Sequence, residues 1–177
     1  MVIAIVAIIF FSAKAVFVKL AYLYEIEALP LLLLRMLFAL PVYIAIALLK
    51  KPKRPEKISS KDYLWILLLG FIGYYLASLT DFLGLEYIKA SLERIILFVY
   101  PTLVILITWV AFKRLPAINQ VIAIIVSYIG IIITFSAELE ISGNAHDVIL
   151  GAVLVFASAL CYASYLVGCG WLFPMFG

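Results

Sequence analysis

Charged residues are scarce in this chain. Of its 177 residues, 13% are Asp, Glu, Lys or Arg, whereas hydrophobic residues make up 68%. A soluble domain usually has about 25% charged and roughly 45–50% apolar residues. A soluble fold of this length could not hide so much apolar surface from water, so lipid is the expected solvent. In lipid, only helices and closed barrels satisfy their own backbone hydrogen bonds.

Histidine and the common catalytic motifs are also nearly absent. The only histidine, His146, lies between two hydrophobic runs, so we expect neither a buried Ser–His pair nor a metal site with histidine ligands. The chain has no His-Glu-x-x-His pattern and no G-x-x-x-x-G-K-[ST] phosphate-binding loop. The sequence therefore predicts neither an enzyme nor an ATPase, and it predicts no cofactor and no metal.

Cysteine occurs only twice, at Cys161 and Cys169 in one apolar segment. Eight residues of helix, at about 1.5 Å per residue, separate them by roughly 12 Å. That distance is too long for a disulfide. We therefore expect both cysteines to be small apolar packing residues.

The chain is rich in continuous apolar runs of about twenty residues. A barrel would instead show roughly ten-residue segments of alternating polarity, whereas runs of this length predict helical spans. The sequence thus predicts an all-α integral membrane protein with about six transmembrane helices. Their expected ranges are residues 2–23, 28–49, 62–83, 92–112, 117–136 and 148–167.

The loops between these runs differ in charge. The second loop, residues 50–61, contains six lysines and arginines, and the fourth contains Lys113 and Arg114, whereas the other three together contain six acidic residues and one lysine. Short basic loops stay in the cytoplasm, so we expect a plasma-membrane protein with both termini in the cytoplasm. The basic loop is then an orientation signal, and no nucleic-acid partner is expected.

Ionisable side chains inside the predicted spans are costly in lipid and are therefore candidates for function. Lys14 lies near the middle of the first run and Arg35 about two turns into the second, while Asp81 and Glu93 are expected at the outer ends of the third and fourth. One interpretation is a set of interhelical ion pairs between these cations and carboxylates. Another is a polar cavity, open to the outside, that binds a solute, and both can hold together.

Two tyrosines complete the set of candidates for a substrate or ion pathway. Tyr74 lies on the third run beside small residues whose main expected role is close helix packing. Tyr100 precedes Pro101, which removes one backbone N–H and bends a helix. Tyr100 also lies seven residues after Glu93, which predicts that both side chains share one helix face.

One stretch has a distinctive order of features. In LGLEYIKASLERIILFVYPTLVILITWVAFKRLPAINQVIAIIVSYIGIIITF, residues 83–135, a Tyr–Pro–Thr sequence at 100–102 is followed by a short basic turn and then by a helix with a late glycine, Gly130. This pattern resembles the EamA-type repeat of the drug/metabolite transporter superfamily. The segments FFSAKAVFVKL and LLLLRMLFALP resemble the first two helices of that repeat.

The resemblance implies a secondary carrier built from two five-helix repeats of opposite orientation, a general transporter design. Residues 1–136 correspond to the first repeat, and residues 147–177 to the start of an inverted second repeat. We accordingly expect a chain truncated after one repeat and one helix, which works with a missing second repeat or as a homodimer.

The expected activity is transport of a small metabolite, such as an amino acid, by alternating access across the lipid bilayer, with a proton as one candidate coupling ion. Apart from Asp62, the first residue of the third span, the predicted spans contain four cations and two carboxylates, which favours an anionic or zwitterionic solute. The alternative is a non-transporting membrane subunit, or an inactive fragment, whose charges only hold helices together.

Overall fold

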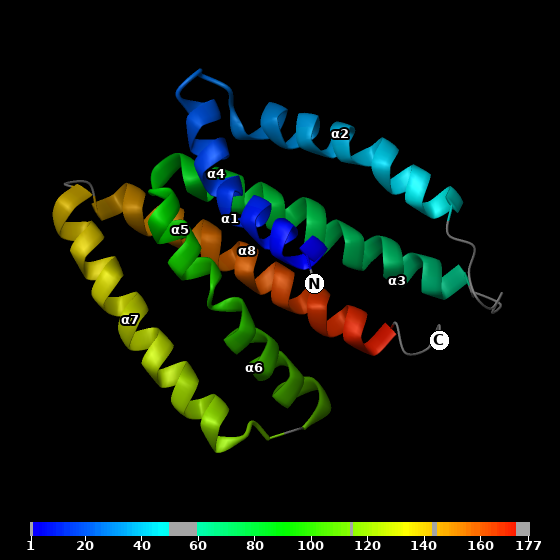
Figure 1. Cartoon of the computed structure of the whole chain (residues 1–177). Coiled ribbons are helices and arrows are strands. Elements are labelled where there is room, and N and C mark those ends of the chain that lie inside the picture. The colour runs from blue at the N-terminus through cyan, green and yellow to red at the C-terminus, as the bar shows by residue number, and fades with distance from the viewer. Residues whose placement is uncertain (1, 50–59, 114, 143–144, 173–177) are drawn as a thin grey trace.

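The computed structural model describes residues 2–49, 60–113, 115–142 and 145–172, and these residues form helices joined by short turns (Figure 1). The basic loop at 50–59 and Arg114, on which the predicted orientation partly depends, lie outside the described residues. The elements are α1 (Val2–Tyr22), α2 (Ala28–Leu49), α3 (Ser60–Gly70), the π-helical segment η1 (Phe71–Leu76), α4 (Ala77–Tyr87), α5 (Ala90–Leu97), α6 (Tyr100–Phe112), α7 (Ile118–Ser142) and α8 (Ala145–Leu172).

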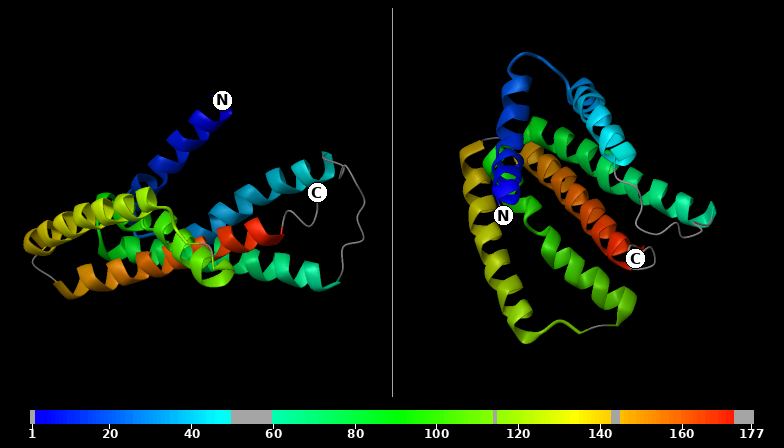
Figure 2. Two further views of the ribbon diagram at one scale, coloured as in Figure 1. Left: turned by 90° about the horizontal axis from the view of Figure 1, so that it is seen from below. Right: turned by 45° about the vertical axis from the view of Figure 1, so that its right-hand side comes forward.

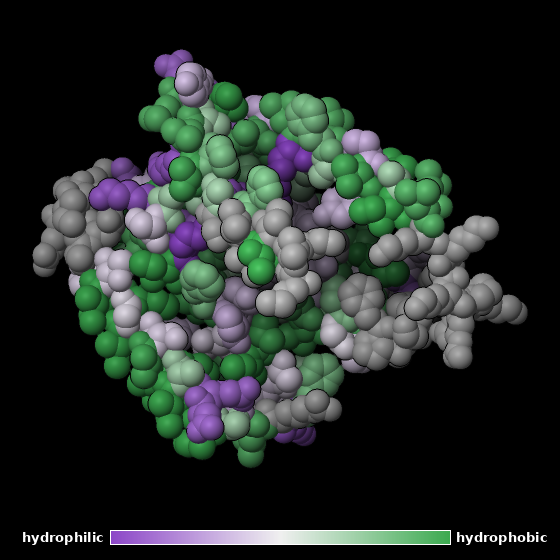
Figure 3. All heavy atoms as spheres, in the orientation of Figure 1, coloured by the Kyte–Doolittle hydropathy of each residue, from purple (hydrophilic) through white to green (hydrophobic). Residues whose placement is uncertain are grey.

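Within the part of the chain that the structure describes, five stretches are long and apolar enough to cross a membrane: Ala28–Leu49, Asp62–Tyr87, Ala90–Phe112, Ile118–Ser136 and Ala145–Leu172. Helix α1, with 21 residues, matches the first predicted run. Much of the surface in Figure 3 is hydrophobic, with smaller hydrophilic patches among it. The predicted all-α membrane fold is therefore confirmed.

Several helices are longer than predicted. The third helix was expected to end at residue 83, but α4 continues to Tyr87, so Asp81 lies inside a helix rather than at its end. Helix α7 likewise extends to Ser142, and α8 covers Ala145–Leu172. The reason is that hydropathy falls where the chain leaves the lipid, whereas backbone hydrogen bonding continues beyond that level.

The fourth predicted helix is two helices. It breaks at Phe98 and Val99, where the Val99 amide bonds to the carbonyl oxygen of Ile96 at 3.0 Å, one residue short of the α-helical pattern. Pro101 explains the break, since it has no N–H to donate to Leu97 and its ring crowds that carbonyl. The prediction that Glu93 and Tyr100 share one face of a continuous helix was therefore wrong.

Helix α8 lies between α3–α4 on one side and α5–α6 on the other (Figures 1 and 2). Its closest approach is to α4, because a Cβ atom built on Gly84 would lie 2.6 Å from Val155 Cγ2 and 3.0 Å from the carbonyl oxygen of Gly151. A Cβ on Gly151 would meet the Gly84 carbonyl oxygen at 3.0 Å and Ile88 Cγ2 at 2.6 Å. Small residues that let two backbones touch are typical of helix pairs in membranes.

This crossing gives a first prediction. Gly151→Val is expected to destabilise the bundle by about 1–3 kcal/mol, because the added methyl groups must push α4 and α8 apart. Gly130→Val is the matched control, since a Cβ there meets nothing within 4 Å among the described residues. The measurement is the midpoint of thermal unfolding in detergent. Equal midpoints for the two variants would contradict the close α4–α8 crossing.

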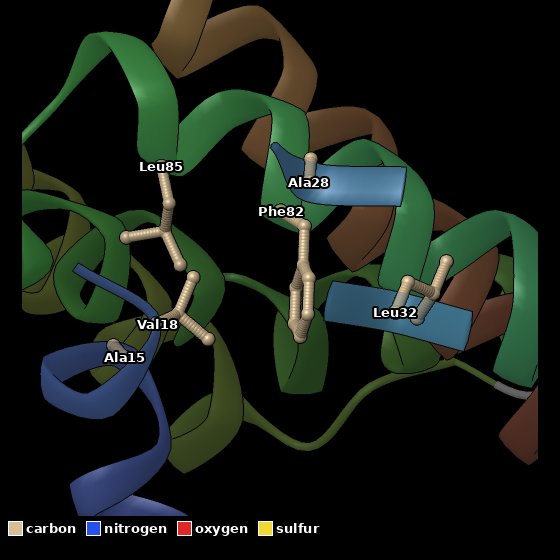
Figure 4. Close-up of a cluster of buried hydrophobic side chains, with 6 residues drawn as sticks. All are labelled: Ala15, Val18, Ala28, Leu32, Phe82 and Leu85. Carbon is tan, nitrogen blue, oxygen red and sulfur yellow. The ribbon is translucent and has the colours of Figure 1, made fainter. Parts of the chain in front are cut away.

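A separate core joins α1, α2 and α4. Its buried residues are Ala15, Val18, Ala28, Leu32, Phe82 and Leu85, and Figure 4 shows the Phe82 ring between the α1 and α2 side chains. Further cores join α8 to α5 and to α6. Cys169 packs with Leu69 and Leu172, and Cys161 and Cys169 are free thiols, as predicted.

Candidate functional site

A cavity of about 530 Å³ lies among α1, α2, η1, α4, α5, α6 and α8. This volume is within the range of roughly 300–1,000 Å³ found for small-molecule sites. Five of the six predicted pathway residues line it, namely Lys14, Arg35, Tyr74, Asp81 and Tyr100. The sixth, Glu93, is fully buried and lies 3.6 Å from the Lys14 ammonium, measured from Glu93 Oε1 to Lys14 Nζ.

A chain of ion pairs forms one part of the site. The Lys14 ammonium donates a hydrogen bond to Asp81 Oδ2 and faces Glu93, whose other oxygen lies 3.2 Å from Arg94 Nε. The side chain of Asp81 is 3% exposed and that of Glu93 is 0% exposed. The predicted interhelical pairing is therefore confirmed for Lys14, which joins α1 to α4 and α5.

Two phenylalanine rings supply additional contacts for the cations. Phe82 lies 5.7 Å from Lys14 Nζ and 5.5 Å from Arg35 Cζ, and Phe11 lies 5.9 Å from Lys14 Nζ and 5.0 Å from Arg94 Cζ, all measured to the ring centroid. Cations within about 6 Å of a ring centroid are attracted by the ring quadrupole. Arg35, expected to pair with a carboxylate, is thus positioned against an aromatic ring.

The ion-pair chain still has unused hydrogen-bonding capacity. Among the described residues, Asp81 Oδ1, both carboxylate oxygens of Glu93, and Arg94 Nε and Nη2 are buried without a hydrogen-bond partner. Buried polar groups without a partner are costly and uncommon. Their concentration in one cluster beside a cavity is therefore a functional signal as well as a structural one.

Tyrosine rings form another part of the site. Tyr74 from η1, Tyr100 from α6 and Tyr162 from α8 line the cavity. Tyr100 meets Tyr162 edge-on at 5.3 Å, Tyr162 stacks on Tyr165 at 6.1 Å, and Tyr165 meets Tyr74 edge-on at 5.6 Å. The rings therefore connect three helices around the cavity.

The π-helical segment η1 positions the Tyr74 side chain at the cavity. Single π turns inside α-helices often occur at functional sites. Gly73 is needed there, because a Cβ atom would lie 2.2–2.5 Å from the Tyr165 side chain. Where the α-helix resumes, the carbonyl oxygen of Ala77 accepts a hydrogen bond from Ser158 Oγ at 2.7 Å. The expected packing role of the small residues near Tyr74 is confirmed.

Sequence reasoning missed three residues of this site as candidates: Arg94, Ser158 and Tyr162. Arg94 lies at the start of the fourth predicted span, where a cation is ordinary. Ser158 and Tyr162 belong to α8, and only its packing against α4 and α6 brings them to the cavity. The available signal was the run of polar and aromatic residues within an apolar helix, SALCYASY at 158–165.

Comparison with known proteins identifies the family of the chain. The profile of the EamA-like transporter family matches residues 1–136. The chain is also 31% identical over 170 residues to a protein of Bacillus subtilis (strain 168) named "Uncharacterized transporter YcbK", an alignment that covers 94% of this chain and 53% of that protein. The chain thus spans about half the length of that relative, and no solved structure matches it. The chain belongs to the EamA-like transporter family, within the drug/metabolite transporter superfamily.

Proposed function

We propose that the chain contributes the solute-binding cavity of a secondary membrane transporter, which moves a small anionic or zwitterionic metabolite, such as an amino acid, by alternating access. The observation that carries this proposal is the cavity itself. Three cations, Lys14, Arg35 and Arg94, line it together with one carboxylate, Asp81, within strongly apolar helices.

The excess of cations indicates the charge of the solute. A carboxylate or phosphate in the cavity would find the Arg94 guanidinium, whose Nη2 has no hydrogen-bond partner among the described residues, and the exposed side chain of Arg35. Charge-assisted hydrogen bonds of this kind are among the strongest that proteins make. A cationic solute would meet like charges in a low-dielectric site, which is unfavourable.

The ion pairs suggest how a proton couples to the solute. Lys14 is held by Asp81 and Glu93 together. A proton bound to either carboxylate would neutralise one of the two negative charges that face Lys14. The Lys14 ammonium would then be available to the solute anion. Because Lys14 belongs to α1 while both carboxylates belong to α4 and α5, the same exchange would loosen α1 and permit the change of access.

The proposed setting is the plasma membrane, with both termini in the cytoplasm. A second repeat, or a second copy of the chain, would complete the pathway, as the inverted-repeat design of secondary transporters requires. The competing proposal is a subunit that does not transport, in which the ion pairs only hold α1 against α4 and α5. The orphaned polar atoms favour the transporter, because a purely structural cluster gains from complete hydrogen bonding.

Reconstitution tests this function. Purified chain in lipid vesicles is expected to take up labelled amino acids or carboxylic acids faster than protein-free vesicles when an inward proton gradient is imposed. Lys19→Met should behave like the unmodified chain, because Lys19 lies five residues from Lys14, about 140° around the same helix. Uptake at the protein-free rate from folded protein, for every anionic and zwitterionic solute tried, would favour the non-transporting alternative.

A further inference from the structure

The tyrosines of the cavity come from three helices that are far apart in the sequence. Tyr74, Tyr100 and Tyr162 all line it, and their rings are linked directly or through Tyr165 at centroid distances of 5.3–6.1 Å. None of the three is fully buried, so each retains surface for a bound molecule. Tyr165 lies beside Gly73 and packs the wall from behind.

Ring walls of this kind recognise two classes of ligand. A planar conjugated ring can stack on a tyrosine or meet it edge-on, whereas an ammonium group can lie over the ring face. The charges of the same cavity distinguish the two, since its lining has three cations and one carboxylate. A cationic ligand is therefore disfavoured, and a planar ligand with an anionic group fits both the rings and the cations.

We propose that Tyr74, Tyr100 and Tyr162 form a subsite for a planar conjugated ring, and that the preferred solute is an aromatic acid whose anionic group is held by the cavity cations. This inference rests on the proposed function, because it names the solute class for the same cavity. Tyr162 is in α8, outside the residues that the family profile matches. The ring subsite is therefore assembled between the repeat and the helix that follows it.

A matched pair of probes separates ring recognition from anion binding. 3-Phenylpropionate and 3-cyclohexylpropionate have the same carboxylate and linker, but only the first has a planar conjugated ring. Binding is measured by ligand-observed NMR on the full chain in lipid nanodiscs. The aromatic acid is expected to bind about two- to tenfold more tightly, which is the gain that aromatic pairing provides beyond buried area.

Variants assign the preference to the tyrosines. Tyr162→Leu should abolish the advantage of the aromatic acid, whereas Tyr162→Phe, which retains the ring, should keep it. Tyr63→Leu is the control, because Tyr63 is 61% exposed on α3 and does not line the cavity. If Tyr162→Leu fails to fold, as judged by gel filtration, Tyr74→Leu makes the same test from the half-exposed side of the wall.

Each of the other possible results contradicts a specific part of the proposal. Equal binding of the two acids overturns the ring subsite and leaves the proposed transport of anions intact. Loss of the preference in Tyr162→Phe overturns it as well, since the hydroxyl and not the ring would then be responsible. If benzyltrimethylammonium, a cation with the same kind of ring, binds more tightly than the aromatic acid, the proposed negative charge of the solute is wrong. Absence of binding by either acid contradicts this inference and the proposed function together.

Discussion

Lys14→Met is expected to reduce solute transport in reconstituted vesicles by about 100-fold. Removing one charged partner of a buried pair costs about 2–5 kcal/mol, and each 1.4 kcal/mol is about tenfold in affinity or rate. Lys14 pairs with both buried carboxylates, Asp81 and Glu93, and also lines the cavity. In the proposed function, its loss removes a contact to the solute as well as the link between α1 and the α4–α5 region. The measurement is initial uptake rate per amount of inserted protein.

A second variant separates this function from folding. In Lys14→Met/Asp81→Asn the charge of Lys14 and that of its direct partner are removed together, so much of the lost stability should return, because no uncompensated charge of that pair remains. Transport should stay low, since the cation that we propose contacts the solute is still missing. If the double variant transports at the normal rate, Lys14 only holds helices together.

Hydropathy was sufficient to predict the fold class and the approximate spans. Lipid penalises exposed polar groups, so each span must be a run of about twenty apolar residues, which can be recognised in the sequence. It could not reveal two departures from a regular helix. The break at Phe98 and Val99 required knowing how the chain resolves the clash at Pro101, and sequence indicated only that a bend occurs. The π-helical turn at Phe71–Leu76 has no hydropathy signature, since it changes the hydrogen-bond register without changing composition.

The site was predictable to the extent that its members are costly in lipid. Lys14, Asp81 and Glu93 were identifiable because each is an ionisable group within an apolar run. Tyr162 was not, since a tyrosine in a membrane helix is ordinary and its value here depends on how α8 packs against α6. Contacts of that kind depend on the crossing of Gly84 with Gly151, which fixes the position of α8 relative to the repeat.

The ion-pair chain connects parts of the bundle that differ in how many helices they contact. Asp81 is anchored to α8 through its own helix, because the carbonyl oxygen of Ala77, one turn earlier, accepts a hydrogen bond from Ser158. Lys14 belongs to α1, which in Figure 2 projects away from the layer that contains α8. A change of charge at the carboxylates would thus act between a fixed pair of helices, α4 and α8, and a helix with fewer neighbours. This arrangement favours a site that couples proton binding to helix movement over a cluster that only holds the helices together.

Amide substitutions of the two carboxylates test that coupling directly. Asp81→Asn and Glu93→Gln retain nearly the same shape but neither can carry a transferable proton, so at least one of them should fail to accumulate solute above the external concentration when a proton gradient is imposed. Exchange of labelled for unlabelled solute at equilibrium, which needs no gradient, should persist in the same variant, because without coupling free energy a gradient drives nothing although the pathway still turns over. Glu25→Gln, in the exposed turn before α2, is the control and should accumulate solute normally. Normal gradient-driven accumulation in both amide variants would exclude this pair of carboxylates as the proton site and leave Lys14 with a binding role alone.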